Sequence, residues 1–156
     1  MSFMPVPPEQ TLMSVHRDKR IISLTGEDVR DFLNDILTAQ ISTLASDTAR
    51  AACLLSPQGR ILFDMMVMAT ADTVFLITEA EQAAPLAKRL TMYRLRRKIE
   101  ITVSSNLCAG HIWGEAHADF SVPNSCISAY DERHKALGKL VLFSKIDGLP
   151  EPVSYT

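Results

Sequence analysis

The sequence lacks the features that mark secreted, membrane and disulfide-rich proteins. No apolar run approaches the roughly 20 residues that a membrane-spanning helix needs, and residues 1–10 have neither the basic start nor the apolar stretch of a secretory signal. The cysteines, Cys53, Cys108 and Cys126, form no CxxC pair, which is typical of reduced thiols. The net charge of -2 gives no basic field for nucleic acid. We therefore expect a cytoplasmic protein without nucleic-acid or membrane partners.

Signatures of metal and catalytic sites are also missing. The four histidines show neither HExxH nor a paired spacing with cysteine, so we expect no metal site. The glycines form neither GxGxxG nor a P-loop, and no GxSxG or cysteine-centred signature favours a nucleophile. The sequence therefore names no catalytic residue.

What is present is typical of a globular domain of ordinary size, with 156 residues of which 47% are hydrophobic and 22% charged. Residues 11–24 predict a hairpin whose polar turn runs from His16 to Arg20. A helix over 27–41 follows, which Thr25 can cap and whose apolar residues recur at helical spacing. A second helix is predicted at 81–95, and further strands are predicted at 48–56, 60–69, 73–79, 99–103, 126–130 and 137–143.

The order of these elements predicts the fold class and the organisation of the chain. Strands followed by helices favour an α+β domain with an antiparallel or mixed sheet and its helices on one face. Residues 1–10, with three prolines, are expected to be a flexible tail, and 11–105 a domain. Because residues 104–124 show little periodicity, we interpret 106–156 as a connection and the start of a second, truncated α+β region.

Asp64 needs an explanation, because it interrupts the apolar stretch LLSPQGRILFDMMVMA, residues 54–69. Side chains alternate along a strand, so Asp64 shares a face with Met66 and Met68. With a four-residue SPQG turn, the facing pairs would be Ala51 with Asp64, Cys53 with Leu62, and Ala49 with Met66. The carboxylate would then lie among small side chains that leave room above it.

Two interpretations of Asp64 stay open on spacing alone. An ionised carboxylate that is buried without a partner is costly, so Asp64 must be exposed, paired or facing a ligand. The structural interpretation is an edge position or a salt bridge to an arginine. The functional one is a site for a flat heteroaromatic ligand, because adaptable methionines beside one acceptor suit such a molecule.

The basic run YRLRRK, residues 93–98, also has two interpretations. Cations at a helix end complement the helix dipole, so a solvated terminus accounts for them. The alternative is that Arg96 or Lys98 steers the anionic tail of a ligand.

The chain contains, in this order, LTGEDVRDFLNDILTAQI, LLSPQGRILFDMMV, LTMYRLRRKIEI and AYDERHKALGKL. Together these stretches resemble the N-terminal part of the YgfZ family, the folate-binding relatives of the glycine-cleavage T-protein. The resemblance implies a ferredoxin-like α+β fold of the T-protein folate-binding type at 11–105. It also implies that Asp64 contacts the pterin of tetrahydrofolate and that Met66 and Met68 line the same site. Arg96 is our candidate for the glutamate tail of the folate.

Several positions depart from the pattern of this superfamily. Phe63 stands at the first of the paired aspartates of T-proteins, which favours the YgfZ branch over the methylene-transferring enzymes. Gln40 stands where an aspartate is common, and Leu140 where an arginine often follows the LG pair. The KGCYxGQE motif of the YgfZ branch is absent, and the family is about twice this long. We therefore expect this chain to be a fragment or a part of a longer product.

Three function classes remain after these departures. The first is a tetrahydrofolate-binding accessory protein that, like YgfZ relatives, supports iron-sulfur cluster assembly or repair, with iron-sulfur proteins or assembly factors as partners. The second is a folate-dependent aminomethyltransferase of the T-protein type, in which Asp64 would assist proton movement. The third is an interaction domain that keeps the fold without a ligand.

Overall fold

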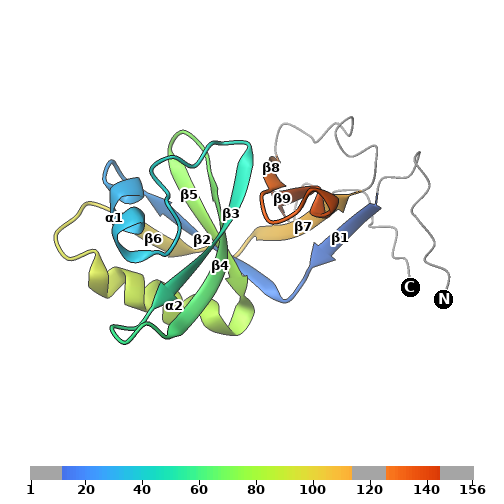
Figure 1. The fold of residues 1–156 in the computed structure, drawn as a ribbon. Coiled ribbons are helices and arrows are strands. Elements are labelled where there is room, and N and C mark those ends of the chain that lie inside the picture. The colour runs from blue at the N-terminus through green and yellow to red at the C-terminus, as the bar shows by residue number, and fades with distance from the viewer. Residues whose placement is uncertain (1–11, 114–125, 145–156) are drawn as a thin grey trace.

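The computed structural model describes residues 12–113 and 126–144, which form nine strands and two α-helices (Figure 1). The first elements in chain order are β1 (Leu12–His16), β2 (Lys19–Thr25), α1 (Val29–Ile36), β3 (Thr48–Leu55), β4 (Ile61–Ala69) and β5 (Thr73–Glu79). They are followed by α2 (Ala80–Tyr93), β6 (Glu100–Val103), β7 (Leu107–Trp113), β8 (Ile127–Asp131), the 3-10 turn η2 (Lys135–Leu137) and β9 (Lys139–Ser144). The predicted tail at 1–10 lies outside the described residues.

The strands join one mixed sheet in the order β1-β7-β9-β8-β3-β4-β5-β2-β6. Neighbouring strands run antiparallel except β3 and β8, which pair in parallel through Thr48 with Tyr130 and Ala49 with Asp131. The predicted α+β class with a mixed sheet is confirmed. Strand β3 links the two parts of the sheet, because it pairs with β8 near its start and with β4 along the rest of its length.

Two cores form on the two faces of β2 to β5. Both helices pack on one face, where Leu33 of α1 and Leu90 of α2 are buried in the same cluster as Val67 of β4. The next residue along β4, Met68, points to the opposite face and is buried with Leu140 of β9. Strands β7 to β9 therefore lie on the face that the helices leave free, and the predicted placement of both helices on one face is correct.

The first helix is shorter than predicted. It ends at Ile36, because Leu37 adopts an extended backbone and forms a bridge with Leu54 of β3. Backbone pairing with β3 thus replaces the helical hydrogen bonds that would continue the element. Asp28 rather than Thr25 is the N-cap, and its side chain makes no capping hydrogen bond. The apolar spacing predicted the buried face correctly but placed the end of the helix too late.

The predicted hairpin at 11–24 is wrong. Arg17 and Asp18 separate β1 from β2, but β1 pairs with β7 whereas β2 pairs with β5 and β6 (Figure 1). The two strands separate because their apolar residues belong to different cores. Val15 packs with Phe143, whereas Ile22 is buried in the helix-side cluster. Tertiary burial has overridden the local turn signal.

Strand β7 lies where the sequence predicted a boundary or a connection. It pairs with β1 on one side and β9 on the other, although Gly110 and His111 interrupt its apolar pattern. The other predicted strands and the second helix are confirmed, with ends that differ from the prediction by at most two residues. The division of the chain at residue 105 stays a prediction.

Candidate functional site

The pairing of β3 with β4 differs from the predicted register. Cys53 lies opposite Asp64, and Ala51 lies opposite Met66, so both predicted partners were wrong by two residues. The turn is one residue longer than expected, and a bulge between Leu54 and Leu55 adds a second residue. Because the total shift is even, Asp64 keeps the face that its alternation with Met66 predicted.

A cavity of about 400 Å³ opens on this face of the sheet. Asp64 and Met66 of β4 line it together with Ala51 and Cys53 of β3. Ala52 of β3 and Met65 of β4 also line it, and its remaining walls come from other parts of the chain, namely His16, Lys19, Ile77, Thr78, Glu79, His111, Arg133 and Leu140. The cavity therefore has a sheet floor that includes Asp64 and a wall that includes the end of β1, strand β7 and the segment after β8.

Of the four predicted ligand-binding residues, the structure brings two together. Asp64 and Met66 line the cavity. Met68 shares their strand face but is 1% exposed and packs in the core between strands β2–β5 and strands β7–β9. Arg96 lines a different cavity of about 660 Å³, beside Tyr93 at the end of α2. Neither Met68 nor Arg96 lines the cavity of Asp64.

The Asp64 side chain is exposed and makes no hydrogen bond or ion pair within the described residues. Its backbone is held, because the Thr78 hydroxyl donates to the Asp64 carbonyl oxygen at 2.9 Å. Two cations of the cavity already have carboxylate partners, since Lys19 pairs with Glu79 and Arg133 with Asp131. The part of the chain that the structure describes therefore gives Asp64 no salt-bridge partner, and its exposed carboxylate is open to a ligand.

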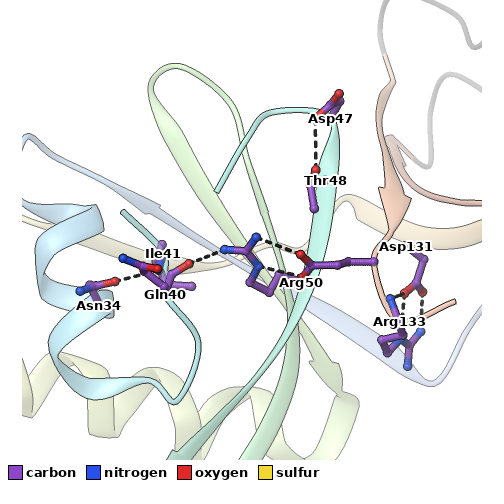
Figure 2. Close-up of polar contacts among 9 residues, drawn as sticks. Asn34, Gln40, Ile41, Asp47, Thr48, Arg50, Asp131 and Arg133 are labelled. Carbon is purple, nitrogen blue, oxygen red and sulfur yellow. Dashed lines mark hydrogen bonds and ion pairs between the residues drawn. The ribbon is translucent and has the colours of Figure 1, made fainter. Parts of the chain in front are cut away.

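A polar chain that the sequence analysis missed forms one wall of the cavity. His16 Nε2 lies 2.6 Å from His111 Nδ1, and His111 Nε2 lies 2.9 Å from Asp131 Oδ2. Arg133 completes the chain, donating from Nε and Nη2 to the two oxygens of Asp131 at 2.9 and 2.6 Å (Figure 2). The Asp131 side chain is fully buried. The spacing of Asp131 and Arg133 in AYDERHK was the available signal, whereas nothing in the sequence links His16 to His111.

A second ion pair fixes the segment that carries this wall. Arg50 of β3 donates from Nε and Nη2 to both carboxylate oxygens of Glu132, at 2.8 and 2.9 Å. The same guanidinium donates from Nη1 to the Gln40 carbonyl oxygen at 2.7 Å (Figure 2). Gln40, one of the departures from the superfamily, thus contributes its backbone to the fold. Leu140, the other departure, lines the cavity with an apolar side chain.

The pKa of Asp131 predicts a loss of stability in acid. Burial alone would raise this pKa, but hydrogen bonds from Arg133 and His111 outweigh it and lower the value from 3.8 to about 2. As the pH falls, Asp131 is protonated in the unfolded chain before it is protonated in the folded one. The stability that ionised Asp131 contributes is therefore complete above pH 3.8 and is lost as the pH falls toward 2. We expect a loss of about 2 kcal/mol across this window. Urea unfolding between pH 5 and 2 measures it.

The matched variant for this measurement is Asp131→Asn, which cannot ionise at this position. It is expected to lose this part of the pH dependence while other carboxylates still titrate. Equal slopes of unfolding free energy against pH in wild type and variant would contradict the assignment.

The described residues hold no group of three or more His, Cys, Asp or Glu side chains placed to bind a metal. No helix in this part of the chain is long and apolar enough to cross a membrane.

Comparisons with known proteins identify relatives of this chain. Residues 13–116 match the family described as GCVT N-terminal domain. The protein described as "Iron-sulfur cluster assembly factor IBA57 homolog, mitochondrial" from Pyricularia oryzae is 28% identical over 133 residues, covering 81% of this chain and 34% of that protein. Its namesake from Chaetomium globosum is 27% identical over 114 residues, covering 61% and 26%. The chain thus spans about a third or less of the length of these relatives.

Two solved structures share the fold. The glycine cleavage system aminomethyltransferase T from Bartonella henselae superposes with a TM-score of 0.72 and 14% identity, over 86% of this chain and 42% of that one. Heterotetrameric sarcosine oxidase from Corynebacterium sp. U-96 gives a TM-score of 0.52 and 13% identity, over 90% and 78%. At these identities the likeness shows the fold alone. The family match and the fold agree with the resemblance found in the sequence, and the chain belongs to the GCVT N-terminal domain family.

Proposed function

We propose that this chain is the tetrahydrofolate-binding part of an accessory protein for iron-sulfur cluster assembly. The observation that carries the folate proposal is the Asp64 cavity. A carboxylate without a protein partner in the described residues lies beside Met66 in an opening of about 400 Å³. This combination suits a pterin, whose ring needs apolar contact and whose N-H groups need an acceptor.

Support for the assembly role comes from the curated relatives, both of which are described as iron-sulfur cluster assembly factors. Partners among iron-sulfur proteins or other assembly factors are part of the same proposal. The aminomethyltransferase alternative has less support in β4, where Phe63 packs against the helix-side core and Asp64 is the strand's one acidic residue.

Calorimetric titration with tetrahydrofolate tests the binding site. The variant Ala51→Trp places a large ring at an exposed position opposite Met66, where it would fill the cavity without disturbing a core. We expect tetrahydrofolate to bind the wild type and binding by Ala51→Trp to be lost, because the ring and the ligand need the same space. Arg96→Gln, at the other cavity, is the control and is expected to retain the wild-type affinity.

The outcomes separate the parts of the proposal. No heat of binding with the wild type would contradict the folate assignment, and full affinity in Ala51→Trp would place the ligand elsewhere. If Arg96→Gln weakens the binding of polyglutamated folate but not that of tetrahydrofolate, Arg96 contacts the glutamate tail of the ligand. The assembly role has its own readout, since Ala51→Trp should fail to restore iron-sulfur enzyme activity in cells that lack a relative of this protein.

A further inference from the structure

The polar chain at the cavity wall fixes which ring nitrogens carry protons. Asp131 is ionised at neutral pH, so it accepts a hydrogen bond and His111 Nε2 must donate it at 2.9 Å. A neutral His111 then has an unprotonated Nδ1, which can only accept. With His111 in this neutral tautomer, the hydrogen bond of 2.6 Å between the two rings has His16 Nε2 as its donor and His111 Nδ1 as its acceptor.

This arrangement leaves one ring nitrogen of His16 uncommitted. Its Nε2 carries the proton that binds His111, so neutral His16 has a lone pair at Nδ1. Within the described residues no hydrogen bond occupies this atom. Asp131 is 4% exposed and His111 is half-buried, so this end of the polar chain lies inside the protein. The other end is His16, which lines the cavity.

The charged groups around His16 favour the neutral ring. Burial lowers the pKa of His16 below its ordinary 6.5, and a protonated His111 would lower it further by repelling a second positive charge. Asp18, on the turn after β1, opposes this effect, whereas Lys19 of β2 and Arg133 add to it. His16 is therefore an acceptor at neutral pH.

The other polar groups of the cavity show what kind of ligand would use this acceptor. The Lys19 ammonium is paired with Glu79, and Arg133 Nε and Nη2 are bound to Asp131. Within the described residues no hydrogen bond occupies the carboxylate of Asp64 or Nδ1 of His16, and both are acceptors. These two acceptors favour a molecule that presents hydrogen-bond donors at two positions.

We propose that His16 is a second ligand-binding residue of the Asp64 cavity, and that the ligand is a flat nitrogen heterocycle with N-H donors for both side chains. The inference rests on the proposed function, because a reduced pterin carries several N-H groups. It adds a residue from β1 that the strand pattern around Asp64 does not include. The hydrogen bonds of the polar chain through His111 and Asp131 hold the His16 ring in the tautomer whose Nδ1 is an acceptor.

Two measurements test the proposal. The first is the ¹⁵N-¹H long-range correlation spectrum of the imidazoles in the ligand-free protein, which identifies the protonated nitrogen of each ring. We expect His16 and His111 both to be protonated at Nε2 at pH 7.5. A proton on His16 Nδ1 would overturn the proposal whether or not folate binds.

The second measurement is calorimetric titration with tetrahydrofolate at several pH values. His16→Phe keeps a planar ring but removes the acceptor, so we expect about a fivefold loss of affinity at pH 7.5. Wild-type affinity should fall further than that of His16→Phe as the pH is lowered through the titration of His16, because the protonated ring offers a donor to the ligand's donors. His134→Phe is the control, because His134 is exposed and does not line the cavity.

The titrations distinguish a failure of the role of His16 from a failure of the proposed function. Equal affinity and equal pH dependence in wild type and His16→Phe would overturn the role of His16 and leave the proposed function standing. Absence of binding by the wild type at every pH would contradict the proposed function and the ligand assigned to His16 with it. A loss in His134→Phe as large as that in His16→Phe would show a general effect of removing a histidine and would contradict the proposal.

Discussion

Gly138→Ala is expected to destabilise the protein by about 3–5 kcal/mol, a large part of the stability of an ordinary domain. Gly138 lies between η2 and β9 with φ of 68°, where an L residue is strained by about 1–2 kcal/mol. A Cβ there would also lie 2.0 Å from the Ile112 carbonyl oxygen and 2.9 Å from Trp113 Cα. These are backbone atoms of β7, so relief requires β7 and β9 to move apart, which adds a packing cost.

Gly59→Ala is the matched control for this prediction. Gly59 also has a positive φ, 84°, but a Cβ there would meet nothing within 4 Å. It is expected to show the conformational cost alone, about 1 kcal/mol. Urea or thermal unfolding of both variants measures the difference. Equal losses would contradict the steric argument, and an unfolded Gly138→Ala beside a folded Gly59→Ala would support it.

Asp64→Asn is expected to weaken tetrahydrofolate binding tenfold to a hundredfold. The substitution keeps the size of the side chain but presents an amide N-H to ligand donors, so a charged hydrogen bond worth about 1.5–3 kcal/mol is lost. The melting temperature of the unliganded protein should stay level or rise, because Asp64 is exposed and makes no ion pair within the described residues.

Calorimetry and a thermal melt on the same samples check both parts of this expectation. Asp72→Asn, at an exposed position in the turn between β4 and β5, removes the same charge away from the cavity and should leave the affinity unchanged. An unchanged affinity in Asp64→Asn together with a lower melting temperature would make Asp64 a structural residue.

The sequence predicted those parts of the fold that local patterns determine. The meander of β3, β4 and β5 follows from apolar stretches separated by polar turns, and the alternation around Asp64 placed its side chain on the correct face. The register was missed because the turn is one residue longer than SPQG and because a bulge between Leu54 and Leu55 has no sequence signature of its own. The end of α1 was missed because Leu37 keeps the helical spacing while its backbone pairs with β3.

The candidate site was predicted in part for the same reason. Asp64 and Met66 are neighbours on one strand, so a period of two sufficed to place them together. The wall that contains His16 could not be predicted without knowing which strands pair. His16 reaches His111 only because β1 pairs with β7 and not with β2. Arg96 stood out by charge, but its position at the end of α2 takes it to another cavity.

The residues that form the cavity wall are far apart in the sequence, and this has a consequence for the order of folding. His16 and His111 are 95 residues apart, and Arg50 and Glu132 are 82 apart, whereas β3, β4 and β5 are joined by short turns. Closing long loops costs more chain entropy, so the meander that carries Asp64 is expected to form before the wall that carries His16. A ligand that contacts both Asp64 on the floor and His16 on the wall therefore binds only the completely folded chain and stabilises it by mass action. Occupancy of the cavity would then report that folding is complete.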